Sequence, residues 1–142
     1  MWYANSMEFV VMKKKINVIK EFNEIPYGRY RFDAPGCEKT SGEIFREQFI
    51  RPILEDLTLE KLIIDFSDES LYGRSFLSEA IGGLIRKAYI TKDEMAKKVE
   101  FIYPKETNQV QILVELSISE SIYNSEPIGY EPDPTRNGTT NL

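Results

Sequence analysis

Residues 61–87, KLIIDFSDESLYGRSFLSEAIGGLIRK, contain a strand, a polar turn and a helix, and they decide the fold. The run LIIDF at 62–66 is short, apolar and bounded by charge, which predicts a central strand buried on both faces. Polar residues follow, and Gly73 suits an unusual backbone conformation before the helix, for which Ser75 is the expected N-cap. The helix is predicted to be amphipathic, because its apolar residues recur at spacings of three and four: Leu77, Ala80, Ile81, Leu84 and Ala88.

Three motifs occur in order along the chain: YGRYRFD at 27–33, SGEIFRE at 41–47, and IDFS at 64–67 followed by SFLSEAIGG at 75–83. Together they resemble the STAS-like domain family of unknown function, which is related to the STAS domains of anti-sigma factor antagonists. The resemblance covers about residues 16–103 and implies a single α/β domain. It further implies a mixed sheet of four or five strands, with helices packed mainly on one face.

In anti-sigma factor antagonists, the Ser that opens this helix is the target of a kinase. Phosphorylated antagonists typically have Asp-Ser-Ser-Gly at this point, whereas this chain has Gly-Arg-Ser-Phe at 73–76. The resemblance therefore implies phosphorylation of Ser75 only weakly.

Composition excludes several classes of protein. A chain of 142 residues is expected to form one domain, and its net charge of -5, with acids and bases interspersed, disfavours a nucleic-acid surface. One Cys and no His exclude an internal disulfide and His-based catalytic triads. No apolar run approaches the roughly 20 residues of a membrane span. The sequence therefore predicts a cytoplasmic protein. It predicts no cofactor, because it has neither a P-loop nor a dinucleotide fingerprint. The family resemblance implies a bacterial or phage origin.

The predicted domain spans residues 16–124, after an N-terminal extension or edge strand at 1–15 and before a disordered tail at 125–142. Residues 16–22 and the aromatic-alternating stretch after Gly28 are predicted to pair as a β-hairpin. Arg29 and Arg31 would then share one face of the second strand. They are either solvated or bind a carboxylate or phosphate, with solvation the favoured interpretation.

The next helix is expected to begin at a capping box formed by Thr40 and Glu43. Cys37, in the loop before it, is expected to be inert because no base is available to activate its thiol. Pro52 predicts a kink or two successive helical pieces. The expected inner face carries Phe45, Phe49, Ile53 and Leu57, and the expected outer face carries Glu43, Arg46, Glu47 and Arg51.

Residues 99–103, VEFIY, are predicted to form another strand, stopped by Pro104. The pattern of residues 108–123 fits both a strand and a helix. Its length, the capping candidates Thr107 and Asn108, and the helix that STAS-like domains place here favour a helix.

The polar junction after the central strand is the predicted site for a partner or a switch, formed by Asp68, Tyr72, Gly73, Arg74, Ser75, Glu79 and Gly82. Ser75 has two interpretations, a structural cap or a phosphorylation switch, and Glu79 on the same side of the helix would repel a phosphate. Asp65, Asp68 and Glu79 are expected to form a solvated rim rather than a metal site. Gly82 and Gly83 are explained either by close packing on the sheet or by the approach of a partner.

The sequence as a whole favours a non-enzymatic regulatory module that docks a protein partner at the loop and helix starting at Ser75. By resemblance, that partner is an ATP-binding kinase-like or anti-sigma-like protein. The alternative is a small-ligand-binding protein or enzyme that uses Arg29, Arg31, Asp68, Ser75 and Glu79, although no base or cofactor motif accompanies them. Homo-oligomerisation through the N-terminal aromatic segment is a third hypothesis.

Overall fold

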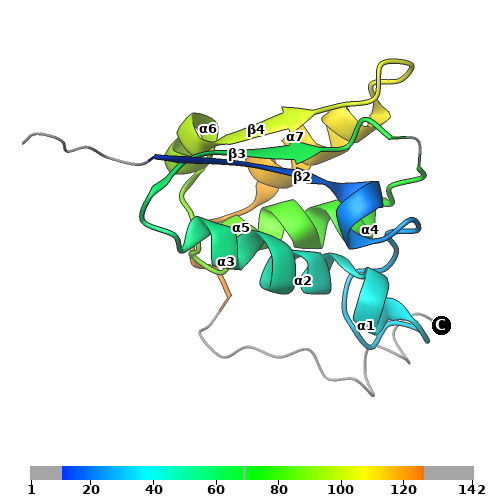
Figure 1. Ribbon diagram of the computed structural model, residues 1–142. Helices are drawn as coiled ribbons and strands as arrows, with labels where there is room; N and C mark the ends of the chain where they lie inside the picture. Colours follow the sequence, from blue (N-terminus) through cyan, green and yellow to red (C-terminus); the bar gives the residue numbers. More distant parts are fainter. Residues whose placement is uncertain (1–10, 69, 127–142) are drawn as a thin grey trace, which may run out of the picture.

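Three parallel strands form the sheet of the computed structural model, which describes residues 11–68 and 70–126 (Figure 1). Their order is β2 (Met12–Asn17), β3 (Leu59–Asp65) and β4 (Val99–Ile102), with β3 in the centre. In the register, Ile64 lies opposite Ile16 on one side and Phe101 on the other. The two predicted strands at 62–66 and 99–103 are therefore present. The expected mixed sheet of four or five strands is not found among the described residues, where both pairings are parallel.

Helices connect the strands, and several of them run into one another. The helical segments, with η marking a π-helical one, are η1 (Val18–Phe22), α1 (Cys37–Thr40), α2 (Gly42–Ile44), η2 (Phe45–Ile50), α3 (Arg51–Leu54), α4 (Arg74–Leu77), η3 (Ser78–Gly82), α5 (Gly83–Arg86), α6 (Lys92–Lys98) and α7 (Gln109–Glu120). Residues 42–54 and 74–86 each form one continuous helix from three such segments. Figure 1 shows both of these helices below the sheet, so they cover the same face of it.

The core lies between the sheet and these two helices. Leu62, Ile64 and Phe66 of the central strand region are fully buried, as the apolar run predicted. Phe45 and Phe76 stack on each other from the two helices, with their ring centroids 6.0 Å apart. Such aromatic pairs contribute about 0.5–1.5 kcal/mol beyond the burial of their surface. The two long helices are thus joined to each other as well as to the sheet.

The predicted β-hairpin is wrong on both of its strands. The first strand ends at Asn17, because the Asn17 side chain accepts a hydrogen bond from the amide of Lys20 (2.9 Å) while Glu21 accepts one from the amide of Asn17 (2.9 Å). These two bonds start a helix where the apolar pattern suggested a continuing strand. The predicted edge strand in the N-terminal extension falls largely on residues 1–10, outside the described residues.

Residues 28–33 form turns instead of the second hairpin strand. Gly28 has a φ of +92°, in the left-handed region that favours glycine. The Asp33 carboxylate accepts hydrogen bonds from the amides of Arg29 (2.9 Å) and Tyr30 (3.0 Å), and Glu43 accepts one from the amide of Arg31 (2.9 Å). Three successive amides are therefore satisfied by carboxylates and are not available to a strand ladder.

The helix at 42–54 begins one residue later than predicted. Ser41 is its N-cap, and the Ser41 hydroxyl accepts a hydrogen bond from the amide of Ile44 (3.3 Å). Thr40 instead donates its hydroxyl to the carbonyl of Tyr27 (2.8 Å). The predicted division into separate helical pieces at Pro52 is not found, because the helix continues from η2 into α3 with helical backbone angles at Ile50 and Arg51. Each predicted face of this helix contains an error. Leu57, expected on the inner face, is fully exposed, and Arg46, expected on the outer face, is buried.

The ambiguous segment near the C-terminus is helical, as favoured. Helix α7 buries Val110, Val114 and Ser117 against the rest of the domain. Glu126, which was assigned to the disordered tail, accepts a hydrogen bond from Arg86 (3.0 Å), while residues 127–142 of that tail lie outside the described residues.

None of the described helices has the length and apolar character needed to cross a membrane.

Candidate functional site

The candidate site lies at the edge of the sheet where its parallel strands end. The segments that follow β2, β3 and β4 meet there because parallel strands present their carboxyl ends on one edge. The segment after the central strand, residues 70–75, is flanked by residues 26–33 on one side and by residues 104–110 on the other. We call residues 70–75 the ridge.

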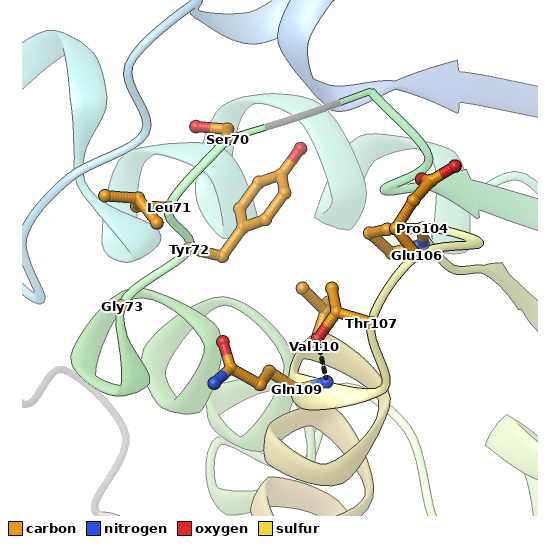
Figure 2. A pocket seen from close by; sticks show the side chains of 9 residues that line it. All are labelled: Ser70, Leu71, Tyr72, Gly73, Pro104, Glu106, Thr107, Gln109 and Val110. Atoms are coloured by element: carbon orange, nitrogen blue, oxygen red, sulfur yellow. Dashed lines mark hydrogen bonds between the residues drawn. The ribbon is translucent and has the colours of Figure 1, made fainter.

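A cavity of about 500 Å³ separates the ridge from the segment after β4. Figure 2 shows its walls, with the ring of Tyr72 projecting from the ridge and its hydroxyl pointing away from Gln109. Thr107 accepts a hydrogen bond from the amide of Gln109 (3.2 Å) at the start of α7, on the opposite wall. The lining residues are Ser70, Leu71, Tyr72, Gly73, Pro104, Glu106, Thr107, Gln109 and Val110.

A second cavity, of about 460 Å³, lies on the other side of the ridge. Leu71 and Gly73 border both cavities, and the side chain of Leu71 is 95% exposed between them. Tyr27, in the opposite wall of the second cavity, is also exposed. The ridge therefore presents an apolar side chain with a hollow on each side. The second cavity is lined by Pro26, Tyr27, Gly28, Arg29, Asp33, Leu71, Gly73, Arg74, Ser75 and Phe76.

Ser75 lies on the ridge but does not cap the helix. The helix begins at Arg74 with Gly73 as its N-cap, and Gly73 has extended backbone angles while its carbonyl accepts the amide of Leu77 (3.1 Å). Ser75 is thus already a helical residue, and its hydroxyl is exposed without a hydrogen-bond partner among the described residues. Arg74 is exposed and forms an ion pair with Glu120 of α7 (3.5 Å). The expected structural cap at Ser75 is therefore wrong.

Tyr72 and Asp68 are partly withdrawn from the surface. The ring of Tyr72 packs edge-on against Phe66, with centroids 5.0 Å apart, and the residue is buried. Neither its hydroxyl nor Oδ2 of Asp68 has a hydrogen-bond partner in the described part of the chain. Burial raises the pKa of the Tyr72 hydroxyl, and the charges of Asp68 and Asp65 raise it further. Tyr72 therefore stays protonated and acts as an apolar wall.

Glu79 is the centre of a buried ion cluster, not part of an exposed surface. Its carboxylate is 1% exposed and binds guanidinium groups from three segments. Oε2 accepts from Nη1 of Arg46 (2.6 Å), while Oε1 accepts from Arg86 (3.2 Å) and Arg29 (3.4 Å). The predicted solvated rim of Asp65, Asp68 and Glu79 is consequently wrong for Glu79, and also for Asp65, which is buried. No group of three or more metal-ligating side chains occurs among the residues that the structure describes.

Arg46, expected on the outer face of its helix, is the main partner of Glu79. It is 1% exposed and also donates to the carbonyl of Glu79 (3.0 Å) and to the carboxylate of Glu47 (2.8 Å). Burial by itself would lower the pKa of the Arg46 guanidinium, but the carboxylates of Glu79 and Glu47 outweigh burial and raise it. Arg46 therefore remains charged inside the protein.

The consecutive glycines Gly82 and Gly83 make room for this cluster. A Cβ atom on Gly83 would lie 2.5 Å from Nη1 of Arg46, and one on Gly82 would lie 2.6 Å from the hydroxyl of Ser121. Close packing therefore explains both glycines, but it is packing against Arg46 and against the end of α7, not against the sheet. Gly82 is buried and presents no surface to a partner.

Residues 41–109 match the family model of a STAS-like domain of unknown function (DUF4325). This segment is therefore similar to STAS-like domains. The matched segment runs from the Ser41 cap to the start of α7 and includes the ridge, Arg46 and Glu79, whereas the YGRYRFD motif lies before it. Searches of curated proteins and of solved structures found no match to the chain.

The two arginines of YGRYRFD meet carboxylates of the matched segment. Arg31 forms an ion pair with Glu43 (3.3 Å). Arg29 reaches Glu79 and also donates to the hydroxyl of Ser78 (3.3 Å), while its side chain keeps 32% of its surface exposed at the second cavity. Of the two arginines proposed for anion contact, Arg29 lines the second cavity, and Arg31 lines neither of the two cavities described at the ridge.

Cys37 is the first residue of α1 and is fully buried. Burial raises the pKa of its thiol, although a hydrogen bond with Thr40 acts in the opposite direction. A buried thiol with a raised pKa is a poor nucleophile, in agreement with the inert role expected for Cys37.

Proposed function

We propose that this STAS-like domain is a non-enzymatic regulatory module that docks a protein partner through the ridge and the helix that follows it. STAS-like domains are generally non-enzymatic regulatory modules, and the matched segment contains the whole ridge. The geometry supports docking at the ridge because this segment is the junction of all three strand ends.

The observation that carries the proposal is the exposure of Leu71. Single exposed apolar residues are common on protein surfaces and need no explanation. Leu71 differs because it stands between two cavities and shares one of them with the exposed Tyr27. A partner that covers Leu71 would also fill the hollows beside it and cover the exposed Tyr27, and Tyr is among the residue types that carry much of the binding energy at protein interfaces.

By family resemblance, we propose an ATP-binding kinase-like or anti-sigma-like protein as the partner, and phosphorylation of Ser75 as a switch. The Ser75 hydroxyl is exposed and is not used in capping, so a kinase could reach it without breaking an internal bond. A phosphate would add nearly two negative charges to the ridge. Glu79 would not oppose it as expected, since its charge is neutralised by buried arginines.

Small-ligand binding is the second candidate function. The cavity of about 500 Å³ falls within the size range of small-molecule sites, and its wall includes the unpartnered Tyr72. An enzyme built on the five polar residues of the junction has less support. Glu79 is buried in ion pairs and Arg31 is bound to Glu43, so these residues do not converge on one accessible point.

The test is affinity capture from a lysate of the cells that natively express the protein, using wild type and Leu71→Asp. The matched control is Leu57→Asp, because Leu57 is equally exposed but lies before β3, at the opposite end of that strand from the ridge. Wild type and the control should retain the same protein, and Leu71→Asp should lose it. Retention by all three forms, or a co-purified small molecule without any protein, would overturn the proposal. Mass spectrometry of the captured chain reports phosphate on Ser75.

A further inference from the structure

We propose that the cavity between Arg29 and Arg74 receives an acidic side chain of the docking partner, with an apolar partner side chain beside it on Leu71 and Tyr27. This inference rests on the proposed docking function and specifies the chemistry of the partner. The partner segment is thus an acidic residue next to a large apolar one, presented by a protein.

The first wall of the cavity supplies a guanidinium with spare hydrogen-bonding capacity. Arg29 uses Nη1 for Ser78 and Glu79, at 3.3 and 3.4 Å. Its Nε and Nη2 atoms have no hydrogen-bond partner among the described residues. The single negative charge of Glu79 is also shared with Arg46 and Arg86, so it only partly neutralises Arg29. Positive charge therefore remains at the mouth of the cavity.

The second wall supplies another guanidinium and a hydroxyl. The side chain of Arg74 is 62% exposed, and its ion pair with Glu120 spans 3.5 Å at the surface. Exposed pairs of this kind contribute little, so Arg74 can turn toward a bound carboxylate at low cost. Ser75, next along the helix, adds an unused hydroxyl donor in the same cavity.

Asp33 is the acidic residue among those that line this cavity. Its Oδ2 accepts hydrogen bonds from the amides of Arg29 and Tyr30 (2.9 and 3.0 Å), which orient it toward the backbone. Two guanidinium groups and one occupied carboxylate leave the cavity positive. Guanidinium groups bind carboxylates with charge-assisted hydrogen bonds, which are about twice as strong as neutral ones.

The rest of the cavity favours a peptide over a free anion. Pro26, Tyr27, Leu71 and Phe76 contribute apolar surface to the same lining. A free anion would leave that surface in water, whereas an acidic side chain beside an apolar one would use both. The chain carries a net charge of -5, so its overall field does not attract acidic partners and the recognition must come from this local pair of arginines.

The test is selection of a displayed library of random peptides on the wild-type protein, followed by titration of the enriched peptides. We expect enrichment of Asp or Glu next to a large apolar residue. Arg74→Glu should raise the Kd of these peptides by about tenfold or more. Lys105→Glu is the matched control, because Lys105 is an exposed cation between two residues that line the other cavity. It should leave the Kd unchanged. Ser75→Glu, which adds a carboxylate to the cavity, should weaken binding as Arg74→Glu does.

The inference would be overturned if no peptide were enriched, or if the enriched peptides lacked acidic residues. It would also be overturned if acidic peptides bound Arg74→Glu as tightly as wild type. Loss of binding in Lys105→Glu to the same extent would also overturn it, by showing a general effect of net charge. These results leave the docking function standing as long as Leu71→Asp loses the captured protein. Failure of that capture experiment, in contrast, removes the docking function itself.

Discussion

Replacement of Glu79 by Gln should destabilise the protein strongly while leaving its shape nearly unchanged. Both carboxylate oxygens of Glu79 accept hydrogen bonds, Oε2 from Arg46 and Oε1 from Arg86 and Arg29. The Gln amide has one acceptor oxygen only, so its NH₂ group must face at least one guanidinium donor. Arg46 also keeps its charge in a site where it is 1% exposed.

Loss of one partner from a buried ion pair costs about 3–5 kcal/mol in the free energy of unfolding, because the other charge stays buried. We expect a value near the lower end, about 3 kcal/mol, because Glu47 still pairs with Arg46 and because Arg29 can turn toward solvent. With a urea dependence of about 2 kcal/mol per molar, the unfolding midpoint should fall by roughly 1.5 M.

Urea unfolding followed by far-UV circular dichroism measures this shift. Glu55→Gln is the control, since Glu55 is 64% exposed and pairs with Arg51 at 3.2 Å on the surface, where removal should cost less than about 1 kcal/mol. The double variant Arg46→Met with Glu79→Gln should lose less stability than the sum of the two single variants. A midpoint for Glu79→Gln within about 0.5 M of wild type, or additive losses in the double variant, would refute the buried pair.

Two further predictions concern the helix ends and the glycines. Ser75→Ala should change the free energy of unfolding by no more than about 0.5 kcal/mol, because the Ser75 hydroxyl caps nothing. Ser41→Ala removes a true cap and should cost about 1 kcal/mol. Equal losses of stability in thermal melts would contradict the assigned helix starts. Gly83→Ala should destabilise the protein by about 1–3 kcal/mol, because the added Cβ lies 2.5 Å from Nη1 of Arg46. Gly73→Ala, where a Cβ meets nothing within 4 Å, is its control, and a Gly83 variant as stable as that control would show that Arg46 is not held against Gly83.

Local pattern was sufficient to predict the elements with a strong apolar signal. The central strand at 62–66, the strand at 99–103 and the helix at 74–86 all have apolar runs or stripes that match one structural period. Burial follows from the same signal, as Leu62, Ile64 and Leu77 show. The position of the candidate site at a strand end was also predictable, because a polar segment between a buried strand and a helix must lie at the sheet edge.

The failed predictions depended on side-chain hydrogen bonds, some between neighbours in sequence and some between distant residues. The first hairpin strand was lost to the local bonds of Asn17 with Lys20 and Glu21. The second was lost because nearby Asp33 and the more distant Glu43 accept the amides of residues 29–31, and the apolar pattern does not show where these carboxylates point. Arg46 and Glu79 have the residue types of a solvated helix face, and only their pairing across 33 residues permits burial. The consecutive glycines were the available signal, since two glycines in a helix indicate that a large group lies against it.

The two cavities beside Leu71 could not be predicted for a different reason. Their walls come from residues 26–33, 70–76 and 104–110, and sequence alone does not show which segments will lie together. The side chain of Leu71 was indistinguishable from a core residue by type, and no local pattern indicates that it is exposed.

The buried cluster predicts that a change at Glu79 affects both the stability of the domain and the proposed recognition. Changes at Arg74 or Leu71 are predicted to affect the proposed recognition alone. Glu79 binds Arg29 from one wall of the second cavity and lies on the same continuous helix as Arg74 and Ser75 from the other wall. It therefore fixes the spacing of the two guanidinium groups from inside, although it touches no ligand. Arg74 and Leu71 have no such internal role, because both are exposed and, among the described residues, the ion pair of Arg74 with Glu120 lies at the surface. Substitutions at Glu79 are expected to change stability and can also change the proposed binding, whereas substitutions at Arg74 and Leu71 are expected to change the proposed binding in a folded protein. Those two residues are therefore the informative ones for the proposed function.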